Sequence, residues 1–347
     1  MSGALMTRQL PVRYFALLIG ALAVQGADTA RLLKRARLDA ARFEDTAGVL
    51  QPAEVEAFLA AAHHVTGRTD LGFETGRLIK LNSHDILGYG MLSCRDLDHL
   101  LRLTSRYYHV INPLFSMRYR RTSAGGEAVF NPLVCMPLRT MHFVMEAIAV
   151  SVQNQIMMLL GPAATGFDIR MGMPAPAHLA RYGQLLPARF HFDEGAVPAV
   201  TLQIGDDALR IALPMASGQV VEQIEAQLAT SKRRPMPHGG WGEYITMLLR
   251  ETVGQQLTLD DIARRMNISA RTIDRNLKKE RLQFRELSQQ VRFDRARDLL
   301  AEPGVTVSNV AEQLGFSDAA NFARAFRRRS GVSASAFQDN PPLRGPA

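Results

Sequence analysis

The sequence has few of the residues that covalent and metal chemistry require. It contains only two cysteines, Cys94 and Cys135, which lie far apart and form no CxxC pair. It also lacks an HExxH zinc motif, a GxSxG nucleophile elbow, a phosphate-binding loop and paired catalytic carboxylates. His63-His64 has no carboxylate at ligand spacing beside it. We therefore expect buried thiols in a reducing cytoplasm, no metal, no cofactor and no enzymatic activity.

The apolar run near the N-terminus is short. Tyr14–Val24 cannot cross a bilayer as a helix, because a span needs about 20 residues. Arg8 and Arg13 precede it, so a signal peptide is one interpretation. The following residues continue at helical spacing with Leu32 and Leu33. This favours a buried first helix in a cytoplasmic protein without membrane contact.

Composition and charge indicate a soluble protein with an uneven charge distribution. The chain has 347 residues, of which 47% are hydrophobic and 21% charged, enough for two or three domains with ample core. Residues 1–231 hold 21 basic and 20 acidic side chains, whereas residues 235–347 hold 17 basic and 13 acidic ones. Lys232-Arg233-Arg234 adds further positive charge. A basic excess in the C-terminal part is typical of a nucleic-acid surface.

The segment Gly304–Gly331 predicts two helices joined by a tight turn at Gly315-Phe316. Thr306 can cap the first helix, and Ser317 or Asp318 the second. At helical spacing, one side of the second helix is apolar and the other carries guanidinium and amide groups, which contact phosphates and base edges. The apolar side holds Ala319, Phe322 and Phe326, and the polar side Ala320, Asn321, Arg324, Arg327 and Arg328.

A similar unit, Leu257–Glu280, lies earlier in the chain. Thr258 and Ser269 can cap its two helices, with a turn at Asn267-Ile268. The second helix again has an apolar side and a polar side. The apolar side holds Ala270, Ile273 and Leu277. The polar side holds Arg271, Thr272, Asp274, Arg275, Lys278 and Lys279. Asp274 could accept a hydrogen bond from cytosine or form an ion pair with Lys278 one turn away.

The two units repeat at a fixed offset. Ile273, Arg275 and Leu277 correspond to Phe322, Arg324 and Phe326, each 49 positions later. Phe284–Leu300 predicts a connecting helix of roughly 25 Å, at about 1.5 Å per residue. The two polar helices could then lie about one DNA turn, roughly 34 Å, apart. We expect them to enter two adjacent major grooves of double-stranded DNA.

Residues 241–340 resemble the DNA-binding domain of the AraC/XylS family of bacterial transcription regulators. The resemblance rests on Ile262-Ala263, Ser269, Arg275, Phe284, Arg292, Ala296, Leu300, Val310-Ala311, Gly315-Phe316, Phe322, Arg324, Phe326, Gly331 and Ser333. The chain departs from the family pattern at Ala334, Gln338 and Arg281, where Pro, a basic residue and Gly are common. The resemblance implies transcription activation through contact with RNA polymerase.

The N-terminal part resembles the arabinose-binding-type domain of one branch of this family, which includes regulators of ornithine use. The matching residues are Leu71-Gly72-Phe73, Gly76, Leu87-Gly88-Tyr89, Tyr107-Tyr108 and Pro174–Tyr182. The resemblance implies a domain that binds a small-molecule effector or forms a homodimer. It does not imply that arabinose is the ligand.

The pattern of the N-terminal part predicts an α+β domain, with helices on one antiparallel sheet. Pro52 can open a helix, and Ser93 with Asp96 can cap another. Pro137 can open a long helix over residues 138–160. The predicted strands are a hairpin over Phe115–Phe130, then Phe167–Met171, Ala188–Phe192, Ala199–Ile204 and a fourth candidate, Ala208–Ala212.

An effector pocket between the long helix and the sheet is one interpretation of the methionines near residues 141–158, because methionine adapts to varied apolar partners. Ordinary core packing is the other. The candidate effector contacts are Tyr89, Arg118, His142 and Met145.

These patterns predict three segments: an effector-binding or dimerisation domain (1–230), a linker (231–240) and an all-α DNA-binding domain (241–340). The last contains helix-turn-helix units at about 258–280 and 306–330. The leading hypothesis is an effector-responsive transcription activator. One alternative is a DNA-binding protein whose N-terminal domain only dimerises. Another is a DNA-repair enzyme with a helix-turn-helix tail, which would need an activated cysteine.

Overall fold

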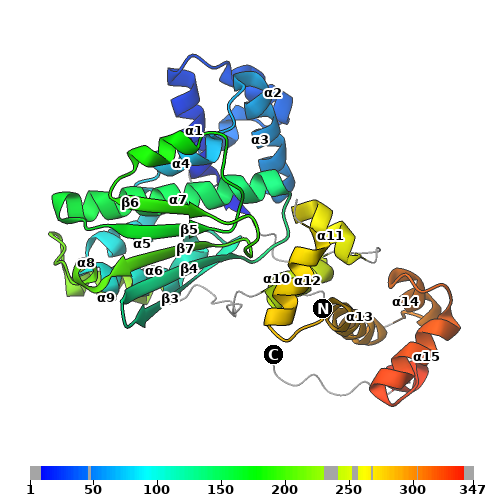
Figure 1. The fold of residues 1–347 in the computed structure, drawn as a ribbon. Coiled ribbons are helices and arrows are strands. Elements are labelled where there is room, and N and C mark those ends of the chain that lie inside the picture. The colour runs from blue at the N-terminus through cyan, green and yellow to red at the C-terminus, as the bar shows by residue number, and fades with distance from the viewer. Residues whose placement is uncertain are drawn as a thin grey trace. The chain divides into compact units, whose positions relative to one another are not determined.

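The computed structural model describes residues 9–45, 48–229, 241–251, 257–266, 269–302 and 304–339. The chain divides into two compact units, Met1–Gly239 and Gly240–Ala347. Figure 1 shows the helices and strands of both units. The predicted linker over residues 231–240 lies outside the described residues.

The N-terminal unit begins with three helices. α1 (Val12–Val24) buries Tyr14, Phe15, Leu18 and Leu22, as predicted for a first core helix. α2 spans Thr29–Ala36, and α3 spans Pro52–Thr66 with its proline in the first turn, which suits the fixed φ of proline. The short strands β1 (Leu10–Pro11) and β2 (Val49–Leu50) pair in antiparallel orientation beside them.

Three further helices precede the sheet: α4 (Leu71–Leu78), α5 (Asp85–Leu92) and α6 (Leu97–Ile111). The predicted capping residue of α6 is wrong. Asp96, not Ser93, is the capping residue, and its carboxylate accepts from the His99 N–H at 2.7 Å. Ser93 instead ends α5. The positive end of the helix dipole also stabilises a carboxylate at this position.

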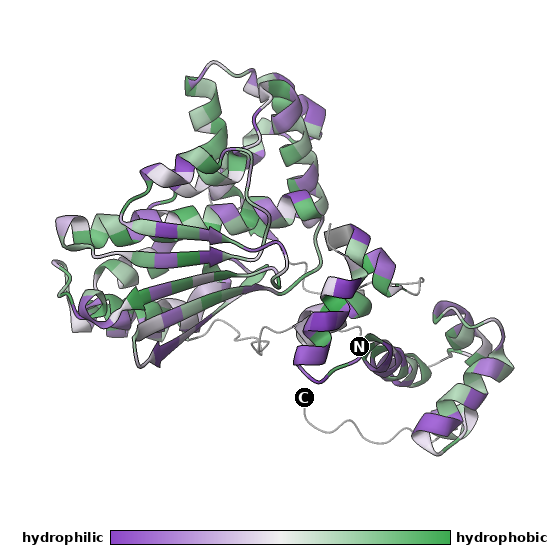
Figure 2. Cartoon of the chain, viewed as in Figure 1, coloured by the Kyte–Doolittle hydropathy of each residue, from purple (hydrophilic) through white to green (hydrophobic). Residues whose placement is uncertain are grey.

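The sheet has five strands in the order β3-β4-β7-β5-β6. They span Phe115–Thr122, Gly125–Pro132, Phe167–Met171, Ala188–Phe192 and Val200–Gly205 for β3 to β7. All neighbours are antiparallel except β5 and β6, which are parallel. The sheet is therefore mostly antiparallel; the long connection between β5 and β6 allows the parallel pairing. Figure 2 shows apolar and polar residues alternating along these strands.

The fourth strand candidate, Ala208–Ala212, is wrong. Residues Asp206–Leu209 form the short helix α8, and the following residues are irregular. Two carboxylates in its first turn favour a helix start over a strand. The last helix of the unit, α9, spans Gly218–Leu228.

The core of the N-terminal unit forms around α7 (Leu138–Leu160), whose bounds match the prediction. Figure 1 shows α7 behind the sheet. By length and composition, this helix with the residues up to Ala163 could cross a membrane, but 72% of its most apolar window is buried inside the protein. We interpret α7 as a core helix that supplies apolar side chains to both the sheet and α4.

The described secondary structure of the C-terminal unit consists of helices joined by turns and short loops. Its helices are α10 (Trp241–Glu251), α11 (Leu259–Met266), α12 (Ala270–Lys279), α13 (Phe284–Leu300), α14 (Val307–Gln313), α15 (Ala319–Ser330) and α16 (Ala334–Asp339). The connecting helix α13 has the predicted bounds. The α+β and all-α fold classes of the two units are confirmed.

Candidate nucleic-acid interface

The first helix-turn-helix unit consists of α11 and α12. Thr258 and Asp261 cap α11 reciprocally: the Thr258 N–H donates to the Asp261 carboxylate at 2.9 Å, and the Asp261 N–H donates to the Thr258 hydroxyl at 3.1 Å. Ser269 caps α12 by accepting from the Thr272 N–H at 3.1 Å. The predicted turn Asn267-Ile268 lies outside the described residues.

The two sides of α12 differ as its sequence requires. Ile273 and Leu277 are fully buried and fix the helix on α10 and α11. Arg271, Arg275 and Lys279 are exposed, and no ion pair holds them within the described part of the chain. They are therefore available for a phosphate or a base edge, because a guanidinium or ammonium group without a protein partner keeps all its donors.

The remaining polar residues of α12 have partners within the helix. The Asp274 carboxylate forms an ion pair with the Lys278 ammonium at 2.7 Å, one of the two alternatives for this residue. Thr272 is half-buried, and its hydroxyl lies 2.9 Å from the Ser269 hydroxyl at the cap. Asn276, which the sequence did not single out, is buried on the inner side.

Glu280 fixes the far end of α12, and sequence reasoning missed it. Its carboxylate accepts from the backbone N–H groups of Trp241 at 2.7 Å and Gly242 at 2.9 Å. These are unsatisfied donors at the start of α10, where the helix dipole favours a negative charge. The contact thus joins the end of α12 to α10, the first helix of the unit.

The second helix-turn-helix unit consists of α14 and α15. Thr306 caps α14 by accepting from the Asn309 N–H at 3.2 Å. Of the two predicted caps for α15, Asp318 is the one used, and it accepts from the Asn321 N–H at 2.6 Å. Gly315 in the turn has a φ of +65°, which glycine adopts without strain.

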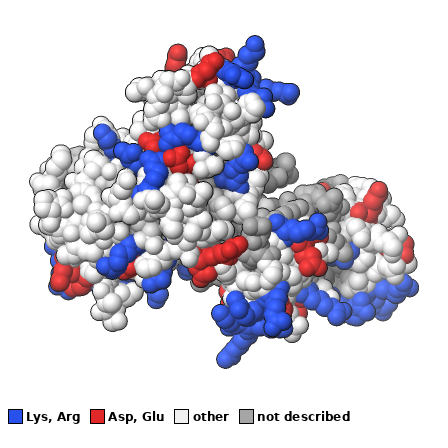
Figure 3. All heavy atoms as spheres, turned by 45° about the horizontal axis from the view of Figure 1, so that its top comes forward, with Lys and Arg blue, Asp and Glu red and all other residues white. Residues whose placement is uncertain are grey.

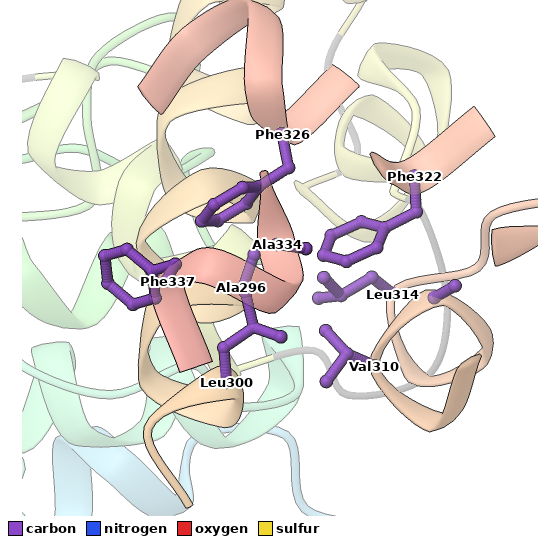
Figure 4. Packing of buried hydrophobic residues seen from close by; sticks show 9 residues of the cluster. Ala296, Leu300, Val310, Leu314, Phe322, Phe326, Ala334 and Phe337 are labelled. Carbon is purple, nitrogen blue, oxygen red and sulfur yellow. The ribbon is translucent and has the colours of Figure 1, made fainter. Parts of the chain in front are cut away.

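A hydrophobic cluster holds α15 against α13, α14 and α16 (Figure 4). Phe322 and Phe326 project into it and are almost completely buried. Phe316 from the turn meets Phe322 edge-on at 5.3 Å, and Phe337 meets Phe326 at 5.4 Å between ring centroids. The apolar side of α15 is therefore fixed by aromatic packing, as predicted.

The opposite side of α15 faces solvent. Ala320, Arg324, Arg327 and Arg328 are exposed. Asn321 is half-buried, and its amide donates to the Ser317 hydroxyl at 2.7 Å and the Asp318 carboxylate at 2.6 Å.

The amide oxygen of Asn321 accepts from Arg324, so the two residues orient each other. Arg329, outside the predicted set, lies against α13: it donates to Gln290 at 2.5 Å and stands 5.6 Å from the Phe293 ring. In Figure 3, Lys and Arg gather along one side of the C-terminal unit. This distribution of basic side chains fits the predicted DNA contacts of α12 and α15, which stay predictions.

The four candidate effector residues lie on three elements, α5, β3 and α7. Tyr89 is 60% exposed on α5, whereas Met145 is fully buried on α7. Arg118 is half-buried on β3, and burial lowers the pKa of half-buried His142. None of the four lines either of two cavities found in the N-terminal unit.

The described part of the chain shows no candidate metal centre. No cluster of three His, Cys, Asp or Glu there could hold a metal ion. Cys94 and Cys135 form no disulfide with each other; Cys94 is buried, whereas Cys135 is half-buried.

Comparisons with known proteins identify both units. The family model described as the arabinose-binding domain of AraC transcription regulators matches residues 26–200, and a helix-turn-helix domain model matches residues 262–340. The chain is 24% identical over 333 residues to the ornithine utilization regulator of Pseudomonas aeruginosa, covering 96% of this chain and 97% of that protein.

Two more proteins match most of the chain. An uncharacterized HTH-type transcriptional regulator of Mycobacterium tuberculosis is 24% identical over 333 residues, covering 90% of this chain and 91% of that protein. The crystal structure of the transcriptional regulator CdpR from Pseudomonas aeruginosa is 20% identical and covers 94% of this chain and 97% of its own, with a TM-score of 0.44. The chain belongs to the AraC family of DNA-binding transcription regulators with an arabinose-binding-type N-terminal domain.

Proposed function

We propose that this regulator is an effector-responsive transcription activator that binds two adjacent major grooves of double-stranded DNA with α12 and α15. The observation that carries the proposal is the shared build of the two helices: each buries one apolar side and exposes arginines on the other, at Arg275 and Arg324. The recognition set is Arg271, Thr272, Asp274, Arg275, Lys278, Lys279, Ala320, Asn321, Arg324, Arg327 and Arg328.

Residues 241–340 form the DNA-binding domain in this proposal, residues 1–230 bind the effector and pair two copies, and residues 231–240 link them. Family membership supports activation through RNA polymerase and a cytoplasmic location. The protein needs no cofactor or metal. The alternative is a DNA-binding protein whose N-terminal unit only dimerises, without an effector.

A gel-shift titration with an operator fragment tests the DNA contacts. Arg324→Ala and Arg275→Ala should each weaken binding by ~1–3 kcal/mol if the arginine reads a base. Arg31→Ala is the matched control, because Arg31 is an exposed arginine on α2 in the N-terminal unit. It should bind as the unaltered protein does. Equal affinity of Arg324→Ala and Arg31→Ala would remove α15 from the proposed interface.

The same titration at several salt concentrations separates base contacts from phosphate contacts. A lost phosphate contact reduces the slope of log affinity against log salt by about one, and weakens all DNA sequences alike. A lost base contact leaves the slope and removes the preference at one position of the operator. We expect Arg324→Ala to show the second behaviour and Lys279→Ala the first.

A further inference from the structure

Two cavities inside the N-terminal unit share a wall. The first, of about 60 Å³, lies between α5, α6, α7 and strands β3 and β4. The second, of about 50 Å³, lies between α1, α4, α6 and α7. His84, Tyr108, Ile111, Ile148 and Ser151 line both. The two spaces therefore adjoin, with the imidazole of His84 at their boundary.

The lining of both cavities is mostly apolar, and its described residues carry no charged side chain. Among the described residues, no Asp, Glu, Lys or Arg lines either one. The hydroxyls present already have partners: Thr104 donates to the Leu100 carbonyl at 2.8 Å, and Ser151 donates to the Ile148 carbonyl at 3.0 Å. A charged molecule or a polyol would be buried here without enough partners, which is costly. The lining thus selects against amino acids and sugars.

His84 supplies one polar position in this apolar surrounding. It is 4% exposed, its Nδ1 lies 2.9 Å from the Tyr14 hydroxyl, and its Nε2 lies 3.0 Å from the Gln155 amide nitrogen. Burial and then the nearby Arg13 charge lower the pKa of His84 to about 3. The imidazole is neutral at physiological pH and both of its nitrogens have protein partners, so a neutral polar group of a ligand would take the place of Gln155, which also lines the first cavity.

The size of the cavities limits the ligand. An apolar cavity of roughly 150 Å³ holds benzene, and each of these spaces is smaller. A chain with as many heavy atoms as benzene would therefore extend through both cavities and displace the wall they share, at which His84 stands.

A displacement at His84 could be transmitted to α9 through α5, which begins at the next residue. Asp85 begins α5 with a φ of +50°, a strained conformation for a residue other than glycine. α5 packs on α9, and a Cβ added to Gly90 of α5 would lie only 3.1 Å from the Ile224 side chain. α9 is the last described helix before the predicted linker, so a shift of α5 would move the element that leads to the DNA-binding unit.

We propose that the paired cavities at His84 are the effector site, and that they take a small aliphatic molecule with one uncharged polar group. The inference rests on the proposed effector-responsive function and specifies the ligand class. It replaces Tyr89, Arg118, His142 and Met145 as effector contacts, since none of them lines these cavities. We expect arabinose, after which the domain family is described, not to bind at this site.

Thermal unfolding of the full-length protein with named probes tests the site. The apolar probes are 1-pentanol and pentanamide, and the polar probes are L-arabinose and L-lysine. A ligand that binds only the folded state raises the melting temperature, by about 5 °C near saturation. We expect this rise, beyond any solvent effect, with pentanamide and 1-pentanol, and none with arabinose or lysine.

Variants on α7 locate the binding. Val152 lines the first cavity and is half-buried, so Val152→Phe should fill the space and abolish the rise. Met158→Phe is the matched control, because Met158 lies on the same helix, is 51% exposed and lines neither cavity. It should keep the full rise.

Thr104→Val keeps the proposal testable if Val152→Phe does not fold. The substitution replaces a hydroxyl of the lining with a methyl group, which makes the lining more apolar, so the rise with 1-pentanol should persist or increase. No rise in the unaltered protein, an equal rise in folded Val152→Phe, loss of the rise in Thr104→Val, or a rise with arabinose each overturns the inference. Operator binding is measured in parallel: if it holds while the probes fail, only this inference falls, and if it fails, the proposed function falls.

Discussion

The guanidinium of Arg292 lies 3.7 Å above the ring of Phe316. Arg292 comes from the connecting helix α13, whereas Phe316 belongs to the turn between α14 and α15. The same guanidinium donates to the Leu314 carbonyl, from Nε at 3.2 Å and from a terminal nitrogen at 2.9 Å. The Arg292 side chain thus satisfies the backbone carbonyl at the end of α14 and covers the aromatic ring of the following turn.

We predict that Arg292→Lys destabilises the second helix-turn-helix unit by about 1–2 kcal/mol. Lysine keeps the charge but has no planar fork to stack and donate twice. Burial, which already lowers the pKa of Arg292, makes the lost partners costly. Hydrogen exchange of the α15 amides measures the effect, and Arg285→Lys on the exposed start of α13 is the control. Unchanged protection in Arg292→Lys would show that charge alone suffices.

Arg281 follows α12 with a φ of +59°, in the left-handed region. An L-residue there costs about 1 kcal/mol relative to glycine, which explains why glycine is common at this position in the family. We predict that Arg281→Gly stabilises the C-terminal unit by about 1 kcal/mol. Urea unfolding followed by the fluorescence of Trp241 reports this, since Trp241 is the sole tryptophan and is buried.

Arg281→Ala is the control for that substitution. It removes the same charged side chain but keeps a Cβ in the strained conformation, so its stability should stay near that of the unaltered protein. If Arg281→Ala gained as much as Arg281→Gly, the charge and not the backbone would be the cause.

His84 makes the stability of the N-terminal unit depend on pH. Its folded pKa is about 3, below the unfolded value of about 6.5. Between these values the unfolded chain binds a proton that the folded chain does not, so stability falls as pH falls. The loss is about 1.4 kcal/mol per pH unit, or about 2 kcal/mol from pH 6.5 to 5.

Hydrogen exchange of the α6 and α7 amides at pH 7 and pH 5, corrected for intrinsic exchange rates, measures this loss. His84→Gln should reduce it, because glutamine can bond to Tyr14 without taking up a proton. His64→Gln is the matched control, since His64 is exposed on α3, and it should leave the loss unchanged. A pH dependence that survives in His84→Gln would assign it to other groups.

Cys94 should resist alkylation in the folded protein. Its thiol is fully buried, lies 3.2 Å from the Gly90 carbonyl, and has its pKa raised to about 12, first by burial. The thiolate is the reactive species, so little is present at neutral pH. Native mass spectrometry after iodoacetamide should find Cys94 unmodified until urea is added. Fast modification of the folded protein would revive the enzyme alternative, which needs an activated cysteine.

The sequence predicted most of the C-terminal unit because its signals are local. Caps at Thr258, Ser269 and Thr306 and the apolar positions Phe322 and Phe326 each act within a few residues of the chain. Contacts between distant segments were not predictable in this way. The Glu280 carboxylate at the start of α10 and the Arg292 fork over Phe316 depend on how the helices pack.

The N-terminal unit was predicted less completely. Periodicity and proline gave the bounds of α7, but strand pairing depends on partners far along the chain, so the parallel pair β5 and β6 was missed. The candidate effector residues were chosen by residue type, whereas a cavity is defined by what the fold leaves unfilled. His84 has no distinguishing pattern around it in the sequence.

Genome-wide capture of DNA by the full-length protein at near-physiological salt tests the central claim most directly. If α12 and α15 read bases in adjacent major grooves, enrichment should fall on a few promoters that share a two-part site with halves about one DNA turn apart. Arg324→Ala should lose the preference for one half. Uniform, salt-sensitive capture across the genome would contradict the account, because it would mean that the basic helix faces bind only phosphate.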